Sequence, residues 1–295
     1  MLIKSIALGV AALVLSTGVM AQSVPSQITV YSSANAGARI DTCKTVLDIY
    51  ESRYNAKIRY EFRPGSDGVI AMEAMLQDPG FSLLCSGPSE SIFNKNLYPD
   101  RAKSHDQLTM VTMLSVGASS FYTGPRTAET DLVSLLATKR PLKVGTHSSA
   151  QKFIGAQVFG DHRITWVNFS KPMDALPSLL DGSIDIYMSS GSYEALVKEG
   201  RVKTLGFING SNQYVQGIDL TSQFPKAARL PLFLALTTNA KQDVKVITEL
   251  NSRLQSIITD ESVRERYAKM SQKPLPTTVD KANNTVSFFR DLLVK

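Results

Sequence analysis

The stretch KIRYEFRPGSDGVIAMEAMLQDPGFSLLC, residues 57–85, carries the pattern that decides the fold. Its first six residues alternate polar and apolar side chains and predict a strand, and its last five residues predict another. Between them, the turn Arg63–Gly68 precedes apolar residues at helical spacing, and Asp78-Pro-Gly80 ends that helix. A strand, a helix and a strand in this order predict a right-handed crossover within a mostly parallel sheet.

The alternation of strands and helices continues on both sides of this stretch. Upstream, Gln27–Tyr31 predicts a strand and Ile40–Tyr54 predicts a helix. Residues 142–208 repeat the pattern, and we therefore predict an α/β fold with two lobes, each a mostly parallel sheet flanked by helices. In the second lobe we expect strands at Leu142–Gly145, Ile164–Phe169, Ile184–Met188 and Val202–Ile208, and helices at Gln151–Phe159, after a capping Ser170, and at Glu194–Glu199.

Two extended apolar segments predict crossings between the lobes. They are Leu108–Tyr122 and Arg229–Thr238, and they make the first lobe discontinuous. We expect the first lobe to comprise residues 22–117 and 232–295, and the second lobe to comprise residues 118–231. Two such crossings form a hinge.

The C-terminal part of the chain predicts helices that return to the first lobe. Residues 244–258 carry apolar side chains at helical spacing. The segment Thr277–Asp280 is typical of a capped helix start, and we expect Val286, Phe288 and Phe289 of the last helix to face inward.

Composition excludes several classes of function. The 295 residues favour about two domains, and 43% hydrophobic with 20% charged residues indicates a globular chain. The net charge of +6 is spread along the sequence, which argues against a nucleic-acid-binding arm. Two Cys and three His, none closely spaced, offer no ligand set for a metal, so we expect no metal and no cofactor.

The first residues have the pattern of a cleavable secretory signal peptide. Lys4 precedes the apolar run Ile6–Leu15, and Val19-Met-Ala21 places small or medium residues at the cleavage positions. We expect residues 1–21 to be removed and the mature protein to be periplasmic. The alternative is an uncleaved N-terminal anchor.

Export bears on the two cysteines, Cys43 and Cys85. In an oxidising compartment the pair can form a disulfide, which the chain-entropy model values at about 4 kcal/mol for a loop of this length. The positions, one in the first helix and one at the end of the third strand, can approach each other in an α/β sheet. Two buried thiols are the alternative.

Four loops after strands are rich in hydroxyls and small residues. They are Ser32–Gly37, Ser86–Ser91, Thr146–Ser149 and Ser189–Ser192, and ligands of open α/β sheets bind at such strand ends. Small residues expose backbone N–H groups, and helix starts favour anions, so neutral donors facing a carboxylate are expected. The candidate ligand-binding residues are Tyr31, Ser32, Ser33, Asn35, Ala36, Gly37, Arg39, Ser86, Ser89, Thr146, His147, Ser148, Ser149, Ser189 and Ser190.

Arg39 and His147 are the most specific of these candidates. The Arg39 guanidinium, at the start of the first helix, could bind a carboxylate through two hydrogen bonds, or it could lie at the surface. His147 could donate to a ligand oxygen or lie outside the contact shell. The sequence has none of the common catalytic motifs, such as G-x-S-x-G, H-E-x-x-H or a P-loop, so we expect no enzyme activity.

Five motifs in order resemble those of the tripartite tricarboxylate transporter substrate-binding proteins, also called Bug-type receptors. The turn at 61–70 is similar to their N-R-P-G-A-x-G-x-I motif, and Asp260–Arg266 is similar to D-P-E-V-R-E-R. Matching stretches also occur at 78–84, 174–186 and 200–206. The resemblance spans nearly the whole chain after the signal peptide.

This resemblance implies a two-lobed periplasmic-binding-protein-like fold that closes on a small carboxylate-bearing ligand. It also implies delivery to the permease subunits of a tripartite tricarboxylate-type transporter, and we expect a monomer. The family's first loop usually reads P-G-G-A-T-D, whereas here Ser33–Arg39 lacks the diglycine. An arginine at this place could favour a ligand with more negative charge.

Two other functions remain open at this point. A periplasmic hydrolase or lyase could use the same cleft, and steady turnover of a bound ligand would indicate it. A module that presents its ligand to a membrane kinase would have the same sequence features as an uptake receptor.

Overall fold

The computed structural model describes residues 24–94, 100, 106–191, 193–210, 213–230 and 232–294. Of residues 292–294 only the backbone is described. The expected signal peptide, residues 1–21, lies outside these residues, and so does Ser192. Within the described ranges, no helix is long and apolar enough to span a membrane.

The first sheet has six strands in the order β11-β4-β10-β3-β1-β2. The strand β1 pairs in parallel with β2 and β3, as the strand–helix–strand pattern predicts. The crossing strands β4 and β10 add antiparallel pairings, so the sheet as a whole is mixed. Its strands are β1 (Gln27–Ser32), β2 (Lys57–Phe62), β3 (Ser82–Ser86), β4 (Leu108–Gly117), β10 (Leu232–Asn239) and β11 (Gln272–Pro274).

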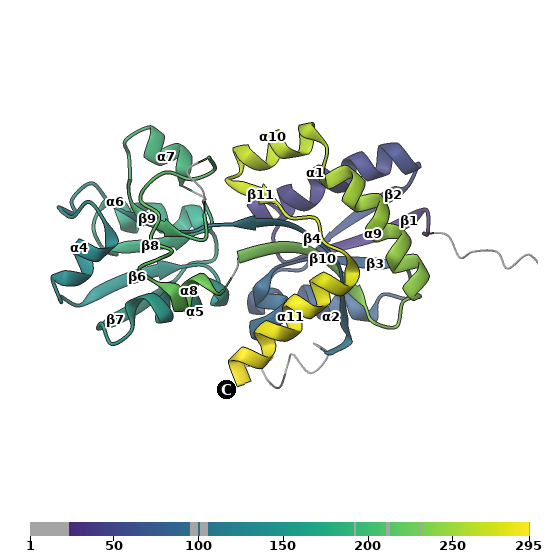
Figure 1. Cartoon of the computed structure of the whole chain (residues 1–295), viewed down its shortest axis with the longest axis horizontal. Helices are drawn as coiled ribbons and strands as arrows, with labels where there is room; N and C mark the ends of the chain where they lie inside the picture. Colours follow the sequence, from purple (N-terminus) through teal and green to yellow (C-terminus); the bar gives the residue numbers. More distant parts are fainter. Residues whose placement is uncertain are drawn as a thin grey trace, which may run out of the picture.

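The second sheet has five strands in the order β7-β6-β8-β5-β9. Here β6 pairs in parallel with β7 and β8, and β5 adds antiparallel pairings because it enters from the first sheet. In Figure 1 the two sheets form two halves of the molecule, with connecting segments running between them. The strands are β5 (Ser119–Thr123), β6 (Leu142–Thr146), β7 (Ile164–Asn168), β8 (Ile186–Ser189) and β9 (Lys203–Ile208).

Helices cover both faces of the first sheet, because successive side chains of a strand point to opposite faces. Leu83 and Cys85 pack into the core that α1 and α9 cover, whereas Leu84 packs with α2. The helical segments of this half are α1 (Ala38–Tyr54), η1 (Ser66–Gly68), α2 (Val69–Gln77), η2 (Ser89–Phe93), α9 (Val244–Ile258), α10 (Glu261–Lys269) and α11 (Val279–Val294).

The helices of the second half are shorter. The longest of the described ones is α5, which buries Ile154 and Val158 against the second sheet. They are α4 (Leu132–Ala137), α5 (Ser149–Phe159), η4 (Pro172–Ala175), α6 (Leu176–Leu180), α7 (Glu194–Lys198) and α8 (Pro225–Ala228).

Two local predictions were wrong. The helical segment after Ser170 begins only at Pro172, so Lys171 and not Ser170 occupies the capping position, and it makes no side-chain capping hydrogen bond. Proline favours the first helical position because its fixed φ suits the first turn. Phe288, expected to face inward, is 58% exposed, whereas Val286 and Phe289 are buried. Position 288 lies on the outer face of α11. The buried face of this helix is therefore narrower than we expected, and it includes Val286 and Phe289 but not Phe288.

Candidate functional site

Loops at the ends of strands from the two sheets meet at one place, which we call the interlobe contact. Asp67 of η1 and Ser89 of η2 belong to the first half, and Ser149 at the start of α5 belongs to the second. The Ser149 N–H donates to Asp67 Oδ2 at 3.0 Å, and the Ser149 hydroxyl donates to the same oxygen. That hydroxyl also lies 3.1 Å from the hydroxyl of Ser89. Beside it, Phe93 and Phe153 pack with their ring centroids 5.0 Å apart.

Arg39, the predicted ligand-binding cation, forms an ion pair with Glu90 inside the protein. Its Nη1 donates to Glu90 Oε1 and, at 3.0 Å, to the Ser33 hydroxyl. The other oxygen of Glu90 accepts from the Gly87 N–H at 3.0 Å. The Glu90 side chain is fully buried and that of Arg39 is 20% exposed, so the guanidinium charge is compensated from within the chain.

Burial also affects the pKa of this arginine. Desolvation lowers the pKa of Arg39, and the nearby carboxylate of Asp67 acts in the opposite direction. Arg39 therefore lies within electrostatic range of a second acid in addition to Glu90.

The turn before α2 has an unusual backbone. Gly65, Ser66, Asp67 and Gly68 have φ angles of 115°, 47°, 49° and 93°, all in the region that favours glycine. A side chain at Gly68 would collide with the carboxylate of Glu90. The Asn94 amide donates to the carbonyl oxygen of Asp67 at 3.1 Å and holds the turn. Left-handed non-glycine residues in succession are strained and cluster at functional sites.

The loop before α5 is organised by its own hydrogen bonds. Ser148 caps the helix, since its hydroxyl accepts from the Gln151 N–H at 3.2 Å. The Gln151 amide, oriented to satisfy its neighbours, donates to the Thr146 hydroxyl at 3.0 Å and accepts from the Ser190 N–H at 3.1 Å. The β6–α5 loop and the end of β8 are thereby fixed to each other.

His147 points back into its own half. Its Nδ1 lies 2.7 Å from the Tyr187 hydroxyl, and the two rings stack with centroids 6.1 Å apart. Tyr187 in turn stacks on Tyr193 at 4.8 Å. Burial, together with the positive charge of Arg39, lowers the pKa of His147 to about 4, and the nearby Asp67 acts in the opposite direction. The imidazole is therefore neutral at pH 7.

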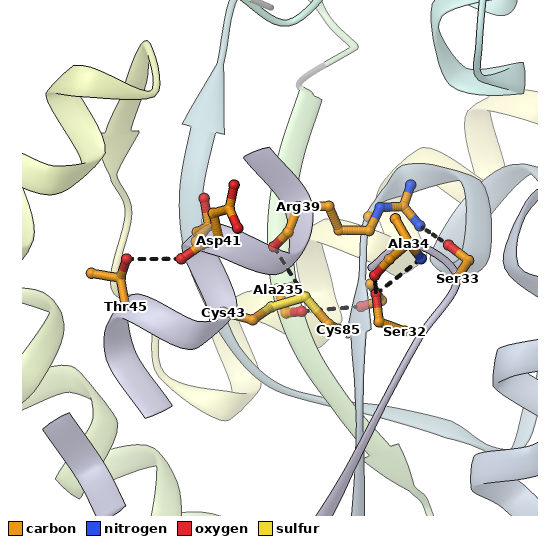
Figure 2. The surroundings of a disulfide bond; sticks show 12 residues. Ser32, Ser33, Ala34, Arg39, Asp41, Cys43, Thr45, Cys85 and Ala235 are labelled. Atoms are coloured by element: carbon orange, nitrogen blue, oxygen red, sulfur yellow. Dashed lines mark hydrogen bonds between the residues drawn. A yellow bond between two sulfur atoms is a disulfide. The ribbon is translucent and has the colours of Figure 1, made fainter. Parts of the chain in front are cut away.

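Cys43 and Cys85 form a disulfide below the start of α1 (Figure 2). Their Cα atoms are 6.2 Å apart and both side chains are fully buried. The bridge joins α1, which begins beside Arg39, to the end of β3, which leads to Glu90. Figure 2 shows the Arg39 side chain extending from this helix toward Ser33.

The other predicted residues have different surroundings. The Tyr31 hydroxyl donates to Asp78 at 2.9 Å, away from the interlobe contact. Ser32 and Ser86 bond to backbone carbonyls within the first half, and Ser189 pairs with Ser120 in the second sheet. Three residues of the first loop are exposed before α1: Asn35, Ala36 and Gly37.

Sequence reasoning missed Asp67, Glu90 and Gln151 as members of this site. Glu90 was discoverable, because it is the one acid within the serine-rich loop Ser86–Ser91. Asp67 lies in the turn Arg63–Gly68, where an aspartate is also an ordinary turn residue. Among the described residues, no group of three or more His, Cys, Asp or Glu could hold a metal ion.

Comparison with known proteins identifies the fold. No protein-family model and no curated protein matches the chain. Among solved structures, Rpa4515 of R. palustris with adipate has 14% identity, a TM-score of 0.80, and covers 91% of this chain and 95% of its own. MatC of Rhodopseudomonas palustris with bound malate has 16% identity, a TM-score of 0.75 and coverages of 90% and 99%. The periplasmic binding protein BugD has 11% identity, a TM-score of 0.74 and coverages of 91% and 97%.

The chain thus has a two-lobed periplasmic-binding-protein-like fold. More closely, its fold resembles that of the Bug-type binding proteins, which confirms the resemblance indicated by the five sequence motifs.

Proposed function

We propose that the protein is an exported receptor that binds a small carboxylate-bearing solute between its two halves. The observation that supports this most directly is the interlobe contact, where Asp67 and Ser89 meet Ser149 across the two sheets. Proteins of the same fold include one with adipate and one with bound malate. The donors around the contact are hydroxyls and N–H groups, which suit carboxylate oxygens.

In this proposal the two crossings act as a hinge between two lobes. The first lobe comprises residues 22–117 and 232–295, and the second comprises residues 118–231. Ligand contacts from both lobes stabilise the closed arrangement over the open one, and the membrane partner recognises the closed form. Ser33, Thr146 and Ser190 would hold the solute by hydrogen bonds, and no covalent bond is formed or broken. The protein acts as a periplasmic monomer and delivers its ligand to a tripartite tricarboxylate-type permease.

A ligand panel tests the proposal. Freshly purified protein is first analysed by native mass spectrometry for a co-purified small molecule, and then by thermal unfolding with adipate, malate, succinate, citrate and amino acids. A ligand at 100 times its dissociation constant should raise the unfolding free energy by about 2.7 kcal/mol. Failure of every small anion to shift unfolding, together with no co-purified ligand, would contradict the proposal. Steady turnover of a bound ligand would move the protein to the enzyme class.

A further inference from the structure

We propose that Asp67 controls ligand binding as a built-in carboxylate: it holds the two lobes together and occupies donors that a ligand carboxylate would use. The ligand therefore has to displace Asp67, which makes this residue a determinant of specificity. The second part of this inference rests on the proposed solute-binding function, whereas the contact itself is a feature of the structure.

The contact has the chemistry of carboxylate recognition. Ser149 is the first residue of the 11-residue helix α5, where backbone N–H groups have no partner within the helix. Its N–H and its hydroxyl both donate to Asp67 Oδ2, so one carboxylate oxygen takes two donors. The helix dipole adds a favourable field for the negative charge. A carboxylate from the first half thus binds a helix start of the second half.

Asp67 is positioned for this role by its own half of the molecule. The Asn94 amide holds its carbonyl oxygen, and the run of positive φ angles from Gly65 to Gly68 turns the side chain toward α5. Ser89, from the neighbouring loop of the same half, supports the Ser149 hydroxyl at 3.1 Å. The contact therefore joins a prepared turn to a prepared helix start.

The charged side chains near the contact disfavour a dicarboxylate while Asp67 is in place. Arg39 is paired with Glu90, and His147 is neutral at pH 7. Within the described part of the chain, Asp67 has no ion-pair partner within 4 Å, so the three charged side chains sum to one negative charge. A dicarboxylate that entered beside Asp67 would meet like charge as well as occupied donors. Displacement of Asp67 frees the donors, but its negative charge remains near the ligand.

This arrangement lowers the apparent affinity for a carboxylate. A closed form held by Asp67 competes with the ligand-bound form, so the apparent dissociation constant rises with the population of the Asp67-bound form. Replacing the carboxylate by an amide removes the charge and weakens the bond to the helix start while the shape of the side chain is kept. The variant should open more readily and bind carboxylates more tightly.

The experiment compares Asp67→Asn with a matched control, Asp131→Asn. Asp131 also accepts from a helix N–H, that of Ser134 at 2.8 Å, but within the second half alone. Small-angle scattering of ligand-free protein should give a larger radius of gyration for Asp67→Asn than for the wild type or Asp131→Asn. Isothermal titration with adipate and malate should give about tenfold tighter binding for Asp67→Asn only. Ser149→Ala removes one of the two donors to Asp67 and should increase the radius of gyration by a smaller amount; its affinity is not compared, because the same hydroxyl would serve the ligand.

Three results would overturn the inference or separate it from the proposed function. Equal scattering curves for Asp67→Asn and the wild type would overturn the closing role. Weaker binding of adipate and malate by Asp67→Asn would overturn the competing role. An expanded Asp67→Asn protein, with no binding of any panel ligand by any variant, would support the closing role and contradict the proposed function. If Asp67→Asn unfolds, Ser149→Ala carries the scattering comparison, and Asp67→Ser carries the titration.

Discussion

The two sides of the interlobe contact differ in charge. The side built on the first sheet contributes Arg39, Asp67 and Glu90, whereas the side built on the second sheet contributes Thr146, His147 and Ser149, which are neutral at pH 7. The charged side is also the one with the disulfide. The charged side is held by the disulfide and by the ion pair between Arg39 and Glu90. On the neutral side, the start of α5 supplies the favourable electrostatic field for a carboxylate. The lobes therefore attract each other through a carboxylate and neutral donors, without an ion pair at the contact between Asp67 and Ser149.

The largest expected effect tests the rigidity of the charged side. Replacing Cys43 and Cys85 together by serine removes a cross-link between residues 42 positions apart and should lower the free energy of unfolding by about 4 kcal/mol. Urea unfolding of oxidised wild type and of the double variant measures this difference. Thiol counting in denaturant is the control, and two free thiols in periplasmic wild-type protein would contradict the premise.

A smaller loss is expected when the buried ion pair is broken. Glu90→Gln keeps the shape of the side chain but leaves the mostly buried Arg39 without a counter-charge, so unfolding should cost about 3 kcal/mol less. Thermal or urea unfolding gives the value. The paired variant Arg39→Met with Glu90→Leu should be closer to wild type, because it leaves no buried charge. Equal losses for the single and the paired variants would argue against the buried pair as the cause.

The smallest effect concerns the neutral side and depends on pH. The pKa of His147 is about 4 in the folded protein and 6.5 in the unfolded chain, so between these values the unfolded state binds more protons. Stability from this group is present above pH 6.5 and is lost as the pH falls toward 4. Between pH 6.5 and pH 5 the wild type should lose about 1.5 kcal/mol more than His147→Gln. Parallel stability profiles for the two proteins would show that His147 is not held neutral by its surroundings.

Much of the fold could be predicted, because it depends on local periodicity. The strand at 57–62, the helix around Ile40–Tyr54 and the extended crossings all lie where alternation and helical spacing indicate. The site was predicted less well, because its acids depend on distant partners. Asp67 bonds to a residue 82 positions away, and Glu90 pairs with one 51 positions away. Glu90 at least stands out as the one acid of the serine-rich loop Ser86–Ser91, whereas nothing in the local sequence of Asp67 distinguishes it from a surface carboxylate.

The sequence by itself determined the α/β class, the two-part organisation and the strand-end loops, since periodicity and turn residues act over a few neighbours. Only the tertiary structure decided the fate of each charge. Arg39 could face solvent, a ligand or Glu90, and the choice followed from the fold, which buries the Glu90 carboxylate fully and places the Arg39 guanidinium beside it. The role of Asp67 likewise depends on the fold, which places η1 beside the start of α5. A hydrogen bond forms only where folding places donor and acceptor within about 3 Å of each other.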